Sequence, residues 1–236
     1  MNTKKLQEIS VLLVAAVLVW LPMGNSWAQS EINVTYIPQF AGQKLSPKNS
    51  DFSYQKKPLK LSKFRCYVSG LEFLKNGKVV WKEETRYFLL DAWKPNTLSR
   101  KVSLPPQVFY DQVRFQIGVD SLTNVSGAYG GDLDPTLGMY WTWNSGYINF
   151  KLEGKSELCT TRKNRFQYHI GGYLPPYSTA QSVTIKSAPG ENLEIGIYLD
   201  EFLSQLNLTE EPELMIPGQR ASELATISSQ IFRTSP

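Results

Sequence analysis

The sequence predicts an all-β protein: an antiparallel β-sandwich, immunoglobulin-like or related, with one or two short helices near the C-terminus. From Phe64 onward, short segments alternate between apolar and polar residues, and turn residues separate these segments. Helical spacing is rare along the chain. Many short strands without interleaved helices favour a sandwich over a parallel α/β sheet.

The expected strands follow one another along most of the chain. They are predicted at 32–37, 64–68, 71–74, 79–81, 87–90, 113–119, 147–152, 166–170 and 195–199. The pair Asn76-Gly77 separates the third from the fourth, and Asn-Gly is a dipeptide that two-residue hairpin turns prefer. A hairpin is therefore expected there.

Two short helices are expected near the C-terminus. One is predicted within 200–208, and a better one follows Pro217-Gly218. Apolar residues keep helical spacing after that point, namely Ala221, Leu224, Ile227 and Ile231. Both helices would pack at the rim of the sheets.

The N-terminus has the three parts of a secretory signal. Lys4-Lys5 precedes the apolar run 9–21, and Ser26-Trp27-Ala28 is a small-x-small cleavage site. We expect residues 1–28 to be removed and 29–236 to form a single domain that is periplasmic or secreted. The apolar run is short for a membrane span, and no lipoprotein cysteine follows it, so we expect no stable membrane anchor.

Charge and cysteine content narrow the class of protein further. The formal net charge is +4 and basic residues are scattered among acidic ones, so we expect no nucleic-acid partner. The two cysteines are Cys66 and Cys159. In an oxidising compartment such a pair tends to close, so a disulfide that stabilises the fold by about 2–4 kcal/mol is expected, with free thiols as the alternative.

The segment 139–147 is unusually rich in aromatic residues. It holds two tyrosines, two tryptophans and a methionine. On an extended chain Met139, Trp141 and Trp143 would share one face. Two interpretations stay open: the tryptophans fill the core of the sandwich, or they belong to a functional site.

His169 is the only histidine in the chain. Strand alternation puts it on the face opposite Phe166, Tyr168 and Ile170, so it points away from the core if those three point into it. A structural or solvent-facing role is one interpretation, and a metal or redox role is the other.

An acidic, glycine-rich loop spans 130–135. Asp132 and Asp134, with Asp120, could offer oxygen ligands to a hard cation such as calcium. Glycine, aspartate and proline are equally what a tight turn requires, so a turn without a cation is the alternative.

The motifs of common hydrolases and nucleotide enzymes are absent from the sequence. There is no G-x-S-x-G, H-E-x-x-H or P-loop motif. A carboxylate pair such as Glu153 with Asp132 remains as a hydrolase alternative. We expect the protein not to be an enzyme.

Several motifs occur together in a fixed order. They are Gly118-Val119-Asp120-Ser121, Asp132-Leu133-Asp134-Pro135, the block 138–147 with its W-x-W-N-S-G-Y core, Leu152-Glu153-Gly154 and Tyr168-His169-Ile170-Gly171-Gly172. This ordered set resembles the MbnP-like copper-binding family, which is associated with methanobactin. The resemblance extends over roughly 32–233.

The resemblance implies a periplasmic β-rich protein that binds copper. In some relatives a tryptophan is oxidised to kynurenine by a di-haem partner of the cytochrome c peroxidase type, which makes Trp141 or Trp143 the candidate here. His169 matches the histidine of the family. Similar sequences have another histidine at position 214, which is Leu214 in this chain. The soft ligands that remain for Cu(I) are His169, Met139, Met215 and whichever of the two cysteines escapes oxidation.

A metal-free function is the alternative to copper binding. On that interpretation the chain keeps the fold of the family, and an aromatic surface that includes Trp141 or Tyr147 binds a ligand or another exported protein. It predicts no bound metal and no oxidised tryptophan.

Overall fold

A computed structural model describes residues 30–84, 87–106 and 108–235. The expected signal sequence, 1–28, lies outside the described residues. The strands are β1 (Ser30–Phe40), β2 (Gln43–Lys44), β3 (Asp51–Tyr54), β4 (Lys57–Lys75), β5 (Lys78–Lys82), β6 (Tyr87–Asp91), β7 (Ser99–Leu104), β8 (Gln112–Ile117), β9 (Tyr140–Trp141), β10 (Gly146–Ser156), β11 (Arg165–Gly171), β12 (Gln181–Lys186), β13 (Asn192–Tyr198), β14 (Glu213–Leu214) and β15 (Phe232–Thr234). The helices are α1 (Ser121–Val125), α2 (Leu199–Ser204) and α3 (Gln219–Gln230), with short 3-10 turns η1 (Pro95–Thr97), η2 (Gly131–Leu133), η3 (Pro135–Leu137) and η4 (Arg162–Asn164).

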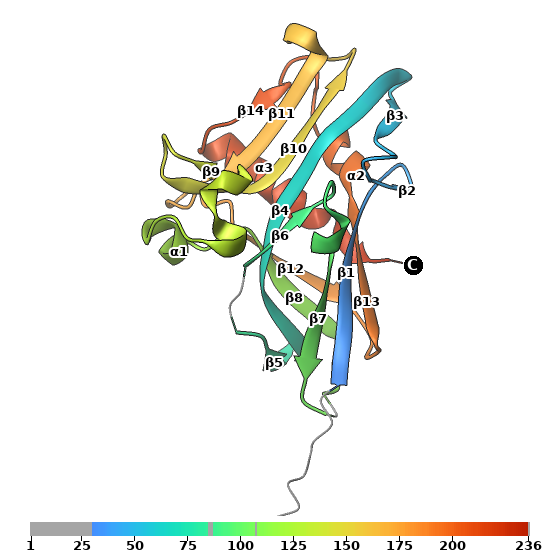
Figure 1. Ribbon diagram of the computed structural model, residues 1–236, viewed down its shortest axis with the longest axis vertical. Coiled ribbons are helices and arrows are strands. Elements are labelled where there is room, and N and C mark those ends of the chain that lie inside the picture. The colour runs from blue at the N-terminus through green and yellow to red at the C-terminus, as the bar shows by residue number, and fades with distance from the viewer. Residues whose placement is uncertain (1–29, 85–86, 107, 236) are drawn as a thin grey trace, which may run out of the picture.

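The strands form two sheets, so the predicted all-β sandwich is confirmed (Figure 1). The smaller sheet has the order β15-β13-β1-β2, with β7 also paired to β1. The larger has the order β12-β8-β4-β10-β11-β14, with β3, β5 and β6 paired to β4 and β9 paired to β10. Most pairs are antiparallel, but β1 with β13 and β11 with β14 run parallel, a detail that the sequence pattern did not predict.

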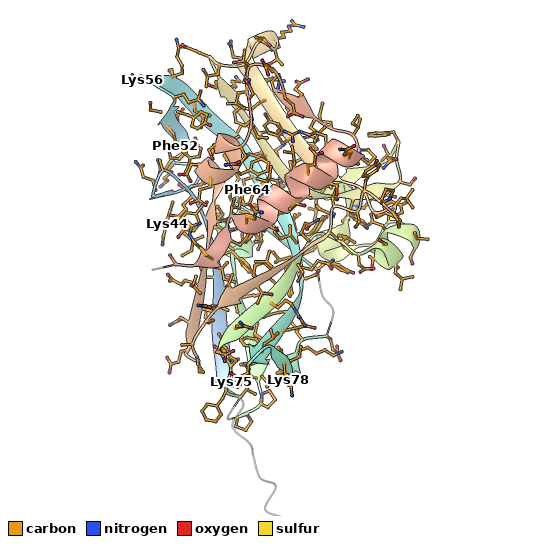
Figure 2. The ribbon with its side chains drawn as sticks, turned by 180° about the vertical axis from the view of Figure 1, so that it is seen from behind. Lys44, Phe52, Lys56, Phe64, Lys75 and Lys78 are labelled. Atoms are coloured by element: carbon orange, nitrogen blue, oxygen red, sulfur yellow. The ribbon has the colours of Figure 1, made fainter. Side chains whose placement is uncertain are left out.

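Strand β4 runs through the larger sheet from end to end (Figure 1). Its first half pairs with β3 and β10, and its second half pairs with β8 and β5. Gly70, with φ +60°, lies where the register shifts between Ser69 and Glu72, which is how a bulge bends a strand. Lys56 and Lys75 therefore lie at opposite ends of the molecule (Figure 2).

The predicted hairpin at Asn76-Gly77 is confirmed. β4 ends at Lys75 and β5 begins at Lys78, and the two turn residues have φ +50° and +76°. Positive φ at both positions is what a type I′ turn requires.

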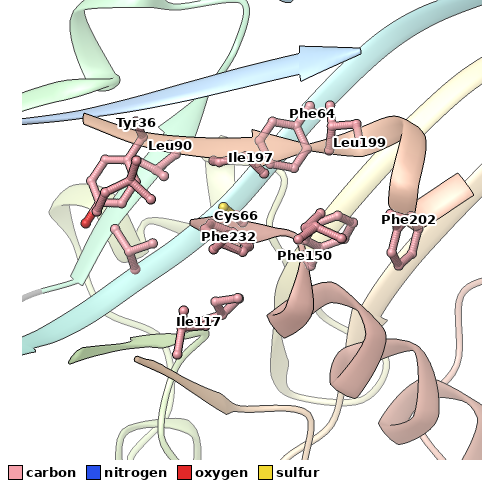
Figure 3. Packing of buried hydrophobic residues seen from close by; sticks show 14 of the residues in the cluster. Tyr36, Phe64, Cys66, Leu90, Ile117, Phe150, Ile197, Leu199, Phe202 and Phe232 are labelled. Atoms are coloured by element: carbon pink, nitrogen blue, oxygen red, sulfur yellow. The ribbon is translucent and has the colours of Figure 1, made fainter. Parts of the chain in front are cut away.

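The main core lies between the two sheets. Tyr36 of β1 and Ile197 of β13 face Cys66 of β4 and Phe150 of β10, with Phe232 beside them (Figure 3). All five are buried. Burying one large apolar side chain stabilises a fold by about 1.5–3 kcal/mol, so this layer is the main source of stability.

Both predicted helices are present near the C-terminus. α2 lies within the predicted 200–208 region apart from its first residue, and α3 begins directly after Gly218. The buried side chains of α3 recur at helical spacing, at Ala221, Leu224, Ala225 and Ser228. α3 packs on β11 and β12 and lies across the back of the molecule (Figure 2). No helix in the described part of the chain is long and apolar enough to cross a bilayer.

The predicted disulfide is wrong, because Cys66 and Cys159 are both buried free thiols. Cys66 of β4 pairs with Phe150 of β10, whereas Cys159 follows the end of β10 at Ser156. Six residues of extended strand span about 20 Å. A disulfide needs Cα atoms within about 7 Å, so the two thiols cannot meet in this fold.

Candidate functional site

One face of the larger sheet carries a row of charged and polar side chains. The register places Arg65 of β4, Lys151 of β10 and His169 of β11 directly across from one another. Lys63 and Glu153 form the next pair along the same strands. We call this surface the outer face, because the alternate residues of the same strands point into the main core.

His169 lies on the outer face, and alternation along its strand had predicted this position. Phe166, Tyr168 and Ile170 are buried in the core on the opposite side. The His169 Nε2 atom lies 2.8 Å from Glu153 Oε1, and 12% of the His169 side chain is exposed. Burial lowers the pKa of His169, and the hydrogen bond to Glu153 offsets only part of this effect.

Glu153 carries a full negative charge at neutral pH. Burial alone would raise its pKa, but the hydrogen bond with His169 and the charge of Lys63 outweigh burial and bring the pKa to about 2. Lys63 Nζ lies 3.3 Å from one carboxylate oxygen, and Lys151 Nζ lies 4.0 Å from the other. Glu153 therefore acts as a hydrogen-bond acceptor between two ammonium groups.

Two basic residues hold a segment of chain over the outer face. Lys151 Nζ donates a hydrogen bond to the Gly138 carbonyl, and Arg65 Nη1 donates to the Leu137 carbonyl, both at 2.5 Å. Arg65 is itself fixed by Asp91 at 2.8 Å. Only 8% of the Lys151 side chain is exposed, and burial lowers its pKa to about 8. These contacts fix the start of the aromatic segment 139–147.

The aromatic segment forms a second, smaller apolar cluster on the outer face. Met139 and Trp141 are buried there with Tyr67, Tyr147 and Ile148. Trp141 therefore packs in an apolar core, which is close to one of the two interpretations of the tryptophans. This core is separate from the main core between the two sheets.

Trp143 differs from Trp141 in its exposure. Its side chain is 64% exposed, while its ring centroid lies 5.5 Å from that of Trp141 at an interplanar angle of 39°. An accessible indole thus contacts a buried one.

The buried indole and the imidazole lie on the same side of β11. A Cβ atom added to Gly171 would be 2.8 Å from the Trp141 ring, so the ring lies directly on this glycine. Gly171 is two residues after His169, hence on the same strand face and about 7 Å along it. The fold therefore brings Trp141 into the neighbourhood of His169.

Met215 follows directly after β14, the strand that pairs with β11. β14 runs parallel to β11 and pairs Glu213 with Gln167 and Leu214 with Tyr168, so the same register carried one residue further leads Met215 toward His169. The chain stays alongside β11 beyond this point, because a Cβ atom on Gly172 would lie 2.9 Å from Pro217 Cβ. Met215 is 36% exposed. Of the three expected soft ligands, Met215 is therefore directed toward His169 by the strand register, whereas Met139 belongs to the second apolar cluster.

The three carboxylates of the suspected cation loop have separate structural roles. Asp120 caps α1, Asp134 caps η3, and Asp132 accepts a hydrogen bond from the Leu89 amide at 3.0 Å. Within residues 30–84, 87–106 and 108–235, no group of three or more His, Cys, Asp or Glu residues is arranged to hold a metal ion. These contacts fit the turn interpretation of the loop.

Next to the indoles, several loops meet at one surface. Ser121 Oγ donates to the Tyr173 carbonyl at 2.8 Å, and the Tyr147 amide donates to Asn124 Oδ1 at 2.8 Å. A half-open cavity of about 240 Å³ opens there. Its lining includes Asn144, Gly172, Tyr173, Leu174, Pro175, Tyr177, Pro217 and Gly218.

Exposed apolar side chains gather on these loops. We call this set the apolar rim, and it comprises Leu122, Val125, Tyr129, Trp143, Leu174, Tyr177, Met215 and Ile216. The sequence has no Lys, Arg, Asp or Glu within 121–131, 139–150, 170–185 or 214–219. The loops beside the indoles are therefore apolar and free of charged residues, in contrast to the charged row around His169.

Comparison with known proteins decides the family. The sequence model of the MbnP family matches residues 29–216. The chain belongs to the MbnP family. Among solved structures, MbnP from Methylosinus trichosporium is similar, with a TM-score of 0.56 and 16% identity over 75% of this chain and 78% of that one. Such low identity shows a shared fold, and no curated protein matches the sequence.

Sequence reasoning missed part of the site in this MbnP-family chain. The sequence does not show that Arg65 and Lys151 hold the aromatic segment, and it offers Glu153 as part of a family motif and as a hydrolase carboxylate but not as the partner of His169. Alternation would have assigned Lys151 to solvent. The sequence signal that could have found them is the two-residue spacing of Lys151 and Glu153. It puts these two side chains on one face of the strand, and Phe150 and Leu152 on the other.

Proposed function

We propose that this MbnP-family protein binds copper outside the cytoplasm and that His169 and Met215 are its first ligands. The observation that supports the proposal is the parallel pairing of β14 with β11, which directs Met215, the residue after β14, toward the only imidazole of the chain. Imidazole and thioether are donors that Cu(I) favours. The proposed role is binding and not catalysis.

The residues fit a copper ion in number and kind only in part. Two soft donors, one on β11 and one directly after β14, leave coordination positions open, and Trp141 lies on Gly171 of β11. Oxidation of Trp141 or Trp143 to kynurenine would add an aromatic amine and a ketone to the site. When bound, copper would supply a soft Lewis acid with two accessible oxidation states.

The oxidation would be carried out by a di-haem partner of the cytochrome c peroxidase type. Trp143 is exposed and contacts Trp141, so an external oxidant can reach the indole pair without opening the fold. The apolar rim around Trp143 has the composition of a protein–protein contact surface, which is rich in aromatic residues and methionine and poor in charge.

The apolar rim also supports a second candidate function. A metal-free protein of this family could use the rim and the cavity beside Tyr173 to bind an apolar ligand or another exported protein. In that case no copper would bind, and both tryptophans would remain unmodified.

Expression of the full chain in a bacterial host, with and without a di-haem partner, separates the two candidates. We expect mass spectrometry to show the loss of residues 1–28 in both samples and conversion of one tryptophan to kynurenine only with the partner. Cu(I) titration should show binding by the wild type. His169→Asn and Met215→Leu should each weaken this binding at least about tenfold, which corresponds to a loss of about 1.4 kcal/mol of binding free energy per ligand.

Met139→Leu is the matched control for Met215→Leu, because Met139 is buried in the second apolar cluster. It should leave Cu(I) binding unchanged. If neither bound copper nor an oxidised tryptophan is found in either sample, the copper proposal fails and the metal-free candidate remains.

A further inference from the structure

We infer that Glu153 is a positioning residue that keeps the His169 proton on Nε2, so that Nδ1 is the nitrogen a metal would use. The part that concerns metal rests on the copper-binding function proposed above. The part that concerns the imidazole tautomer stands on the metal-free geometry alone.

The first step concerns the direction of the hydrogen bond. Glu153 Oε1 lies 2.8 Å from His169 Nε2, and Glu153 also lies within 4.0 Å of two ammonium groups, those of Lys63 and Lys151. A carboxylate between two cations is ionised and can only accept hydrogen bonds. The proton shared by the pair must therefore come from the imidazole, as Nε2–H.

The second step concerns the other ring nitrogen. A neutral imidazole carries one proton, so with Nε2–H in place Nδ1 has a free lone pair. Among the described residues the Glu153 contact is the only side-chain hydrogen bond of His169. Nδ1 is also not among the polar atoms that this part of the chain buries without a partner. Within the described part of the chain, Nδ1 therefore makes no side-chain hydrogen bond and is not fully buried.

The third step concerns the environment around the ring. Lys151 stands directly across from His169 on β10 and is tied to the Gly138 carbonyl, while the β14 side carries Met215. Glu153 therefore fixes the ring from the β10 side and leaves the β14 side for a ligand. Histidine ligands of metals commonly donate their second N–H to a carboxylate, and loss of that carboxylate typically weakens metal binding about 10- to 100-fold.

The test uses the fact that His169 is the only histidine in the chain. A long-range proton–nitrogen correlation spectrum of the metal-free, untagged protein at mildly alkaline pH will contain a single imidazole. We expect a protonated Nε2 and an unprotonated Nδ1. Addition of one equivalent of Cu(I), which is diamagnetic, should shift Nδ1 and leave Nε2 protonated.

Glu153→Gln tests the role of the carboxylate, because an amide can either accept from or donate to Nε2. We expect both tautomers in this variant and Cu(I) binding about 10- to 100-fold weaker. Glu157→Gln is the matched control, since Glu157 pairs with Lys57 at the surface. It should change neither the tautomer nor the affinity.

Three results would overturn the inference: an Nδ1–H tautomer in the wild type, loss of the Nε2 proton on Cu(I) binding, or a folded Glu153→Gln variant with the wild-type tautomer and affinity. If Glu153→Gln does not fold, the two wild-type spectra decide. Absence of Cu(I) binding by the wild type would refute the proposed function and the choice of metal-binding nitrogen, while the metal-free spectrum would still decide the tautomer.

Discussion

At Cys66, the surroundings of a single side chain determine its chemistry. The thiol lies in the main core among Phe150, Ile197 and Phe232 (Figure 3). Burial raises its pKa well above the ordinary thiol range, so almost no thiolate forms in the native protein. Thiolate is the reactive form of cysteine, and the residue should therefore be inert.

We predict that Cys66 resists thiol-reactive reagents in the folded protein, even in mildly alkaline solution. Under denaturing conditions both Cys66 and Cys159 should react without prior reduction, giving two labels per chain by mass spectrometry. A denatured, unreduced sample that takes up no label would mean that the two thiols are joined after all.

Gly171 is a second position where a single added side chain would disturb the packing. An added Cβ would lie 2.6 Å from the Tyr147 carbonyl and 2.8 Å from the Trp141 ring. Gly171→Ala should lower the free energy of unfolding by about 1–3 kcal/mol, the usual cost of overpacking, and displace the indole. Denaturant titration monitored by tryptophan fluorescence measures both effects.

Gly190→Ala provides the control for this substitution. Its added Cβ would have no neighbour closer than 3.8 Å, so stability should change little. Equal stability of the two variants would show that the Trp141 ring does not lie against β11 as described.

Among the elements, strand β10 holds the aromatic segment in place. Its Lys151 donates to the Gly138 carbonyl, and a hydrogen bond from a charged donor contributes about 1.5–3 kcal/mol. Lys151→Met should therefore speed hydrogen exchange of the Gly138 and Ile148 amides, which stabilise this segment, by at least about tenfold.

Lys155→Met makes the same change on the same strand, but Lys155 is exposed. Exchange at Gly138 and Ile148 should keep its wild-type rate in that variant. Faster exchange in both variants alike would mean that general charge, and not the Gly138 contact, controls the segment.

The sequence predicted elements with strong alternation well and others poorly. β8 alternates Val113, Phe115 and Ile117 toward the core and was predicted. β7 and β12 were missed, because each buries only two apolar side chains among polar ones, as Val183 and Ile185 show in β12. Short apolar patterns carry too little signal to distinguish a strand from a loop.

The site was predictable only as far as local alternation reaches. The outward direction of His169 follows from its own strand, as does the inward direction of Tyr168. The surroundings of His169 do not follow from its own strand. A two-residue parallel strand directs Met215 toward it, and a contact with Gly171 brings Trp141 to the same strand. The disulfide failed for the same reason, because strand register between distant segments is set by tertiary packing.

At the scale of the whole molecule, the sandwich separates stability from function. The main core between the sheets holds most of the large buried side chains, whereas His169 and Trp141 lie on the outer face of the larger sheet and the apolar rim lies on the neighbouring loops. Substitutions on the rim should therefore change partner binding without unfolding the protein. This separation allows a clean test of the rim.

The apolar rim carries no charge, so we predict that oxidation by a di-haem partner depends only weakly on ionic strength. Screening by salt slows association that charged surfaces steer, and an apolar contact lacks that steering.

Ile216→Ser should slow kynurenine formation several-fold, because Ile216 is an exposed apolar residue on the rim, next to the site. Val80→Ser, an exposed apolar residue on β5, should not. Intact-mass kinetics at low and high salt measure both, and a steep fall in rate with salt would show that charged residues outside the rim guide the partner.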